Sequence, residues 1–448
     1  MNGDIHIQQV QLRQKRNLIL FIISYVINNL ASGILYDTYV NYLQEVSLPT
    51  ATSFWAFYGY ATFLSALILL FVPKSGYKKL LLFCAASTSA AFFCVVFVKS
   101  ATIFYLSTLL ALTGVQLHFI MLAPYVAAYA GSAGGKSIDW YTRTYYMGYV
   151  GYFLTTFLGG AATVKLFSSH AGISFERARK LTEYITETTG STRDAYLAGN
   201  RDVLIITGVV TLLSIIPILF IREEKSDYIS VDEQQTKKQS LPERVRDILS
   251  VLFRKDAMMY LIYWALISFA MGLFTSYYTV FLNRNLHIDK ATSSLLVSIS
   301  YAAIVLFMLF TPFVVKKMGT VGTICFTVLL SIPFMLIIAN GNHFGKAMIP
   351  MVGIGLFMRA GLANLGSPAD SSLSMMLAPK NLRPAFISVV NFIAGIVSII
   401  SGHFTGSILF TTQEGYRTAY YIAAALYFVA ALVIITLFKK YNRKEAEE

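Results

Sequence analysis

Residues 222–256 read REEKSDYISVDEQQTKKQSLPERVRDILSVLFRKD, a hydrophilic segment of a chain that is otherwise strongly apolar. The segment holds eight basic and eight acidic residues, and a charged side chain is costly to bury in the hydrocarbon of a bilayer. It must therefore lie in water. The segment falls near the middle of the 448 residues, and we count six long apolar runs on each side of it. The sequence therefore predicts two halves of six membrane spans.

The composition agrees with a membrane protein. Hydrophobic residues make up 56% of the sequence and charged residues only 13%, against about 25% charged residues in soluble proteins. Runs of about 20 apolar residues match the thickness of a bilayer core. We expect an all-α polytopic membrane protein with spans at 18–40, 53–72, 79–98, 102–129, 143–167, 202–221, 258–282, 293–315, 321–340, 346–372, 385–411 and 418–438. The expected domains are an N-terminal six-helix bundle (1–221), a cytoplasmic linker (222–257) and a C-terminal six-helix bundle (258–448).

The distribution of basic residues predicts an orientation. With the N-terminus in the cytoplasm, 24 of the 36 Lys and Arg residues fall inside, 11 fall outside and Arg359 lies within a span. Cytoplasmic loops carry this excess in membrane proteins. The net charge of +13 therefore reflects topology, and no nucleic-acid partner is expected. Both termini should be cytoplasmic, and we expect the protein in the cytoplasmic membrane of a bacterium.

A second hydrophilic segment, 168–201, is expected outside. It contains FERARKLTEYIT, in which Phe175, Ala178, Leu181 and Ile185 recur at helical spacing. This pattern predicts an amphipathic surface helix. The helix is either a solvated cap or a lid or partner site.

The two halves repeat each other. Residues 31–44 (ASGILYDTYVNYLQ) align without gaps on residues 270–283 (AMGLFTSYYTVFLN), with identities at Ala31/Ala270, Gly33/Gly272, Tyr39/Tyr278 and Leu43/Leu282. The next spans share a Tyr-Ala pair, and each is followed by a Lys-Lys turn. Two parallel repeats joined by a linker are a transporter architecture that holds its substrate near the middle of the membrane.

With these features the chain resembles the major facilitator superfamily (MFS). The loop after span two keeps Gly76, Lys78 and Lys79 of that family's Gly-x-x-x-Asp-x-x-Gly motif, but Leu69 and Pro73 replace its first Gly and its Asp. Span five, GYVGYFLTTFLGG, has the glycines of the antiporter motif but lacks its proline. The resemblance implies an MFS fold of twelve helices, a secondary transport function, and a central cavity lined by spans one, four, seven and ten.

Span one carries a polar stripe. Its residues recur at steps of four and three, and the repeat places a second stripe on span seven; the two stripes are Tyr25, Asn29, Ser32, Tyr36, Tyr39 and Trp264, Ser268, Met271, Thr275, Tyr278. A polar stripe in a membrane helix faces protein or a water-filled cavity. The stripe either lines the cavity or joins packed helices through hydroxyl groups. We expect Tyr25, Asn29, Tyr36, Trp264 and Tyr278 to bind substrate.

Three ionisable residues complete the expected site. Asp37 lies towards the outer end of span one; there it is either partly desolvated and suited to proton coupling, or an interface residue without a role. His118, near the middle of span four, is either a proton carrier and substrate contact or a neutral structural residue. Arg359 lies near the middle of span ten with Gly355, Ala363 and Gly366 on its face, and Pro368 is expected to kink this helix. Arg359 either binds an anionic group or pairs with an acid, Asp370 or Asp37.

We therefore expect a secondary transporter, not an enzyme, for a small polar and anionic organic solute, operating by alternating access and driven either by a gradient of protons or Na+ or by the gradient of the solute itself. The alternatives are efflux of amphipathic drugs or lipids, and a membrane sensor or scaffold that does not transport. No cofactor or metal is expected, since the three cysteines lie in apolar runs and no Cys/His spacing suits a metal. The expected partners are the solute and the lipid bilayer, and the protein is expected to be a monomer.

Overall fold

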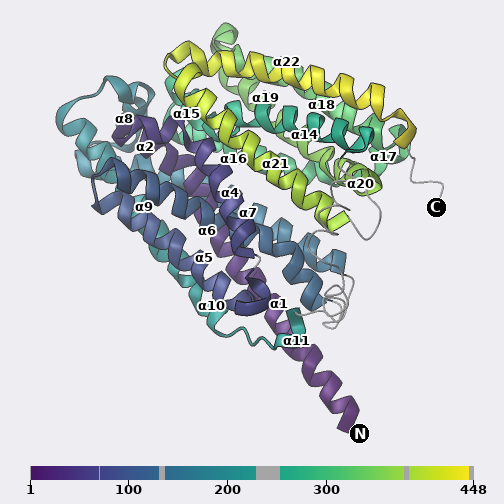
Figure 1. Cartoon of the computed structure of the whole chain (residues 1–448). Helices are drawn as coiled ribbons and strands as arrows, with labels where there is room; N and C mark the ends of the chain where they lie inside the picture. Colours follow the sequence, from purple (N-terminus) through teal and green to yellow (C-terminus); the bar gives the residue numbers. More distant parts are fainter. Residues whose placement is uncertain (1, 70, 131–136, 229–252, 378–382, 443–448) are drawn as a thin grey trace. The chain divides into compact units, whose positions relative to one another are not determined.

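The computed structural model describes residues 2–69, 71–130, 137–228, 253–377 and 383–442, and within them the regular secondary structure is helical (Figure 1). Helices satisfy their own backbone hydrogen bonds, which the interior of a bilayer requires. Eleven described helices are long and apolar enough to cross a membrane, and α4 (Phe54–Leu69) is a shorter apolar helix of 16 residues. Each of the twelve expected spans coincides with one of these helices. The all-α membrane fold is confirmed.

The chain forms two compact units. The first comprises Met1–Ala51, Tyr60–Leu181 and Glu187–Lys237, and the second comprises Thr52–Gly59, Thr182–Thr186 and Lys238–Glu448. Two short segments of the first half, 52–59 and 182–186, thus cluster with the second unit. Of the expected linker, residues 229–252 lie outside the described part of the chain.

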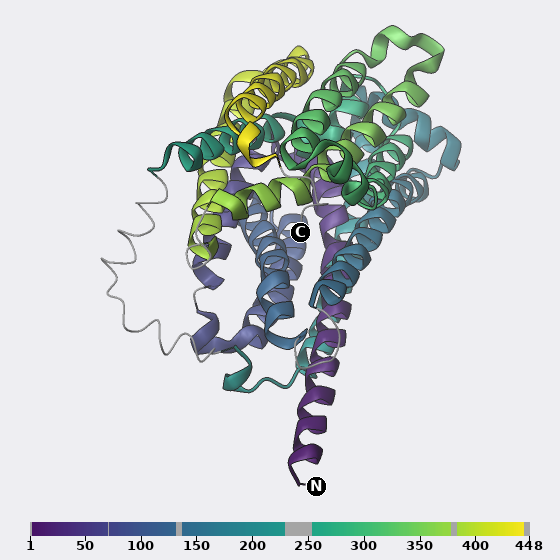
Figure 2. The same ribbon diagram turned by 90° about the vertical axis from the view of Figure 1, so that its right-hand side faces the viewer.

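The first unit is built on five long helices. Its elements are α1 (Asn2–Ile34), η1 (Leu35–Tyr39), α2 (Val40–Val46), α3 (Leu48–Thr52), α5 (Val72–Phe97), α6 (Ala101–Ala130), α7 (Ser137–Ala171), α8 (Phe175–Leu181), α9 (Gly190–Leu213), α10 (Ile215–Leu219) and α11 (Lys225–Tyr228). The turn between α8 and α9, η2 (Thr182–Glu187), falls almost wholly in the second unit. Helix α1 packs against α6, α7 and α9, and α5 packs against α6 and α9. The amino-terminal end of α1 projects beyond the other helices of this unit (Figure 2).

The second unit repeats this construction. Its elements are α14 (Lys255–Phe274), η3 (Thr275–Tyr277), α15 (Tyr278–Arg284), α16 (Lys290–Met308), α17 (Thr311–Met318), α18 (Thr320–Ala339), η4 (Gly341–Ala347), α19 (Met348–Leu365), α20 (Ser367–Leu377), α21 (Arg383–Phe404), η6 (Thr405–Leu409), α22 (Gln413–Leu437) and η7 (Lys439–Tyr441). Helix α14 packs against α21 and α22, and α19 packs against α16 and α18. The yellow α22 runs alongside α18 in Figure 1.

The backbone supports the repeat seen in the sequence. Gly76 has φ 74° and ψ 168°, and Gly319 has φ 79° and ψ 170°. Both glycines therefore occupy a region that residues with a side chain rarely enter. Each follows a short helical segment that opens with a proline at its start, Pro73 or Pro312. The turn after span two thus requires a glycine at position 76, because only glycine adopts this backbone conformation readily.

Two local expectations need adjustment. The amphipathic helix of the outer segment ends at Leu181 and continues as a 3-10 turn in which Tyr184 has a non-helical φ of −125°. Its apolar face is nevertheless inward, since Ala178 and Ile185 are buried. The expected kink near Pro368 is a break: α19 ends at Leu365 and α20 begins at Ser367.

Candidate functional sites

Arg359 lies deep in the second unit. Its side chain is only 4% exposed, and it projects from the middle of α19. The guanidinium lies over the ring of Phe274, 4.6 Å from the centroid, and its Nη2 donates a hydrogen bond of 2.8 Å to the hydroxyl of Tyr427. Arg359 is therefore held by aromatic side chains of α14 and α22.

The groups around Arg359 are incompletely bonded. We call Arg359, Phe274, Tyr278, Tyr420 and Tyr427 the arginine cluster; the ring of Phe274 contacts those of Tyr278 and Tyr420, with centroids 5.7 Å and 5.1 Å away. Within the described chain, Arg359 Nε and the hydroxyls of Tyr278 and Tyr420 are buried without a hydrogen bond of good geometry, although the Tyr278 hydroxyl faces the guanidinium. Buried polar groups are seldom left unpaired, so each such group calls for an explanation.

The expected acidic neighbour on the same helix does not pair with Arg359. Asp370 lies beyond the break, on α20, and its Oδ2 accepts a hydrogen bond of 3.2 Å from Tyr260. Among the described residues, no ion pair joins Asp370 to Arg359. The Asp370 account of this buried charge is therefore wrong for this structure.

Trp264 occupies a different part of α14. Its side chain is half-buried, and its Nε1 is buried without a partner. Within the described chain, no hydrogen bond or ring contact links it to Arg359. The second unit thus brings together Tyr278 and Arg359 from the expected set, while Trp264 stands apart from them.

In the first unit, Tyr25 and His118 meet in an aromatic cluster. The ring of His118 lies 5.7 Å from that of Tyr25 and 5.5 Å from that of Phe21, and Phe21 stacks on Tyr125 at 4.2 Å. His118 is 1% exposed, and its Nε2 has no hydrogen-bond partner. These contacts fit the expected pairing of spans one and four and give His118 an apolar setting.

Asn29 and Tyr36 lie further along the same face of the first span, both half-buried. Asn29 Nδ2 donates to the carbonyl of Tyr25 at 2.8 Å, and the Tyr36 hydroxyl accepts a 3.1 Å hydrogen bond from Gln116 Nε2. Tyr36 also stacks on Tyr152 of α7. The stripe is thus buried or half-buried against protein along its length, as its polarity predicts.

Asp37 is buried, with 1% of its surface exposed, in a π-helical turn, η1. The amide of Asn41 donates to the Asp37 carbonyl at 2.8 Å and approaches its carboxylate at 3.5 Å. The chain stays helical through Val46, so Asp37 lies within the first span and not at its end. Single π turns inside α-helices occur often at functional positions.

The glycines of span five have a packing role. A side chain at Gly148 would collide with the ring of Tyr25, one at Gly151 would crowd the backbone of Val26, and one at Gly159 would meet Ile34. These glycines let α7 approach α1 closely, so α7 covers one side of the polar stripe of α1. The antiporter-like motif thus builds the fold of the first unit.

Sequence reasoning missed Gln116, Tyr152 and most of the arginine cluster. Tyr420 and Tyr427 are seven residues apart and so share a helix face, which was the available signal. Nothing local in the sequence says that this face meets Arg359. Among the described residues, no group of three or more His, Cys, Asp or Glu side chains could hold a metal ion.

Comparisons with known proteins agree on the family. The model of the Major Facilitator Superfamily matches residues 194–402 and 265–448, and no curated protein sequence matches the chain. The nucleoside transporter NupG superposes with a TM-score of 0.69 at 15% identity, covering 94% of this chain and 99% of NupG. A peptide transporter POT in complex with sulfate gives 0.68 at 11% identity, covering 98% and 99%. A bacterial homolog of the human lysosomal transporter Spinster gives 0.66 at 14% identity, covering 97% and 99%. This chain is an integral membrane protein that belongs to the Major Facilitator Superfamily.

Proposed function

We propose that this protein is a secondary active transporter of a small organic anion, and that Arg359 binds the anionic group. The observation that carries the proposal is a buried guanidinium that forms no ion pair with an acid among the described residues. Arginine keeps its charge in proteins, so burial cannot be relieved by losing a proton. Removing an ion from water costs several kcal/mol even after relaxation.

The protein contacts of Arg359 offset only part of this cost. A desolvated cation–π contact contributes about 2 kcal/mol, and one hydrogen bond to a charged group about 1.5–3 kcal/mol. Arg359 has one such hydrogen bond, and Nε has none. A carboxylate or phosphate would satisfy the remaining donors and neutralise the charge.

The surrounding groups favour a solute with both apolar and polar parts. Phe274 offers an aromatic face, and the unpaired hydroxyls of Tyr278 and Tyr420 can donate to further oxygen atoms. Binding pockets typically combine such apolar walls with a few placed polar groups. An amphipathic drug or lipid without an anionic group would use the aromatic surface but would leave the guanidinium unneutralised.

Proton coupling at Asp37 is the second element of the proposal. The carboxylate is buried within the span and lies beside neutral amide and hydroxyl groups, Asn41 and Thr38. Intramembrane acids of this kind mark proton relays in transporters. The orientation with both termini and the linker in the cytoplasm also belongs to this proposal, supported by the bias of basic residues.

The test measures binding and stability together. Purified protein is screened with a panel of small carboxylates and phosphate esters for a rise in melting temperature, and the best ligand is followed by flux and counterflow in proteoliposomes. We expect Arg359→Lys to fold normally and to bind at least about 30-fold more weakly, since lysine cannot reproduce the fork of donors. Arg417→Lys is the matched control, because Arg417 binds Asn340 Oδ1 at 2.7 Å in the same unit.

Three results would contradict the proposal or part of it. Unchanged ligand affinity in folded Arg359→Ala would show that the guanidinium does not hold the anion. A loss of melting temperature in Arg359→Lys without any loss of affinity would give Arg359 a packing role only. Saturable counterflow with no response to any anion would leave transport standing but would remove the anionic solute.

A further inference from the structure

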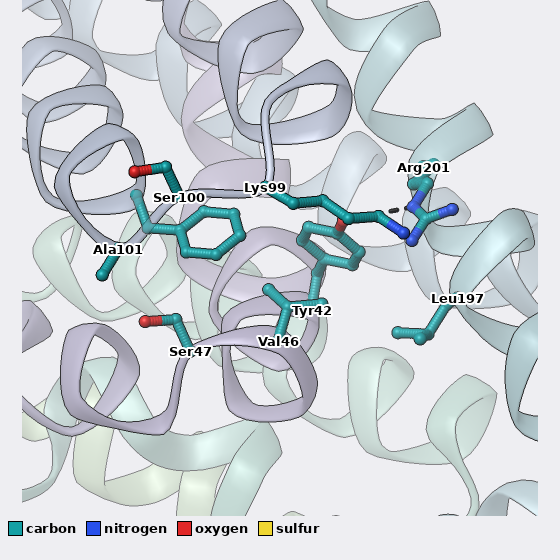
Figure 3. Close-up of a pocket in the computed structure, with 9 residues that line it drawn as sticks. Tyr42, Val46, Ser47, Lys99, Ser100, Ala101, Leu197 and Arg201 are labelled. Carbon is teal, nitrogen blue, oxygen red and sulfur yellow. Dashed lines mark hydrogen bonds between the residues drawn. The ribbon is translucent and has the colours of Figure 1, made fainter.

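A pocket of about 390 Å³ opens in the first unit, separate in the chain from the arginine cluster. Figure 3 shows the residues that line it. They are Tyr42 and Val46 of α2 with Ser47 directly after it, Lys99 and Ser100 of the α5–α6 turn, Ala101 and Phe104 of α6, and Leu197 and Arg201 of α9. No acidic residue is among them. The pocket therefore combines apolar walls with two positive charges.

The two cations of the pocket are not neutralised by the protein. Arg201 uses its Nε to donate a 3.2 Å hydrogen bond to the Tyr42 hydroxyl, and within the described chain neither Arg201 nor Lys99 forms an ion pair. The nearest acids in sequence are engaged elsewhere. Glu45 pairs with Arg193 at 3.2 Å, and Asp202 pairs with His170 at 2.7 Å.

The two side chains nevertheless converge. Figure 3 shows the side chain of Lys99 extending towards Arg201 across the face of the pocket. Like charges brought together repel unless an anion lies between them. Ser100 and Ala101 line the pocket on the side away from this pair, as Figure 3 shows.

The position of the pocket suits the edge of a membrane. Lys99 lies between the ends of two spans, and the residues just before it, Phe97 and Val98, are 68% and 43% exposed. Exposed apolar side chains next to a basic residue are typical of the level where lipid head groups meet the hydrocarbon. A phosphate group therefore reaches this pocket either on a lipid or free in solution.

We infer that this pocket binds a phosphate group between Arg201 and Lys99. A planar fork and a flexible ammonium approach from different directions, which fits a tetrahedral anion with several oxygen atoms. Tyr42 fixes the guanidinium through Nε and leaves its two Nη groups available. The site lies in the unit that does not contain Arg359, so it is independent of the solute site proposed above.

The test compares two forms of phosphate on the purified protein. The melting temperature is measured with sodium phosphate at constant ionic strength, and separately with dihexanoylphosphatidylglycerol against the net-neutral dihexanoylphosphatidylcholine. We expect one of the two anions to raise the melting temperature of the wild type. The Lys99 ammonium bonds to no other group in the described part of the chain, so Lys99→Gln should raise the anion concentration needed for half of the response about tenfold, and Lys99→Gln/Arg201→Gln should abolish the response.

The control removes the same charge outside the pocket. Arg177→Gln/Lys180→Gln changes two exposed bases of α8 and should leave the response intact. A response to phosphate alone identifies a free anion, and a response to phosphatidylglycerol alone identifies a lipid head group. No response to either anion, or an equal response in Lys99→Gln and the wild type, overturns the inference.

Discussion

The first spans of the two halves break their α-helices at the same place in the repeat, but the side chains at the break differ. In the first half a π turn spans Leu35–Tyr39, and in the second a 3-10 turn spans Thr275–Tyr277. The gapless alignment pairs Asp37 with Ser276 and Tyr39 with Tyr278. The irregular backbone is thus common to both halves, while the ionisable group is present in one.

The bonding at the two turns also differs. Tyr39 is buried with its hydroxyl 3.0 Å from Thr108 Oγ1, whereas the hydroxyl of Tyr278 is buried without a partner. The first turn is satisfied by its own unit, and the second contributes to the incompletely bonded arginine cluster. The two halves therefore differ at this turn. The first half carries a buried acid there, and the second carries a tyrosine that belongs to the arginine cluster.

The largest effect is expected from the topology that the repeat requires. In a variant without Cys84, Cys94 and Cys325, single cysteines at the exposed positions Lys79 and Lys317 should react with an impermeant thiol reagent from the cytoplasmic side only. Lys346→Cys should react from the opposite side only. Labelling of Lys79→Cys and Lys317→Cys from opposite sides would contradict parallel repeats.

Substitutions at the two turns should separate proton coupling from solute exchange. Asp37→Asn keeps the shape of the side chain but cannot titrate, so we expect it to abolish pH-driven accumulation while sparing energy-independent exchange. Ser276→Ala is the matched variant at the equivalent position of the repeat and should leave pH-driven accumulation unchanged. Both are measured as uptake into proteoliposomes with and without a pH gradient. Normal accumulation by Asp37→Asn would remove this residue from the coupling mechanism.

The same substitution at the two paired tyrosines should have different consequences. Tyr39→Phe removes the hydrogen bond to Thr108 Oγ1, which keeps its own bond to the Phe104 carbonyl, and should cost about 1 kcal/mol of stability with little effect on solute affinity. Tyr278→Phe removes an unpaired hydroxyl, so stability should be unchanged or higher, while solute affinity falls about tenfold. Melting temperature and binding isotherms of both variants decide the matter. Equal loss of stability in both would mean that Tyr278 is bonded as Tyr39 is.

The sequence predicted the spans and the repeat because both rest on local patterns. Runs of apolar residues identify helices in a bilayer, and alignment of two segments needs no structure. The interruption near Pro368 was placed correctly by the same local rules, although it is a break between two helices where a kink was expected. These features accordingly agree with the fold.

The arginine cluster and the phosphate pocket depend on contacts between distant helices. Tyr427 lies 68 residues from Arg359, and Arg201 lies 159 residues from Tyr42. Each of these side chains has an ordinary local context, so periodicity cannot pair them. Asp370 was a candidate partner for Arg359 only because both lie in one expected span; the break at Gly366 and the hydrogen bond from Tyr260 gave it another role.

The smallest effect is expected where the two ends of the linker meet their own units. At the first end, Glu223 accepts a 2.9 Å hydrogen bond from the Lys78 backbone, and burial raises the pKa of this carboxyl above its ordinary value. At the second end, Asp256 accepts hydrogen bonds from Lys440 at 2.7 Å and Tyr441 at 2.6 Å, and the bond to Asp256 raises the pKa of Lys440. The two ends should therefore respond differently to pH.

For Glu223, the folded state binds the proton more tightly than the unfolded state does. Burial of this carboxyl therefore does not reduce the stability of the fold at low pH, where it is protonated, but reduces it as the pH rises through the raised pKa. Glu223→Gln cannot ionise, so the melting temperature of this variant minus that of the wild type should increase by roughly 2 °C from pH 5 to pH 8. The Lys440 interaction is fully present throughout this window, because a lysine with a raised pKa loses its proton only above about 10.4. The melting temperature of Lys440→Gln should therefore differ from that of the wild type by the same amount at every pH from 6 to 8. Parallel curves for Glu223→Gln and the wild type would show that the carboxyl is not destabilised by its surroundings.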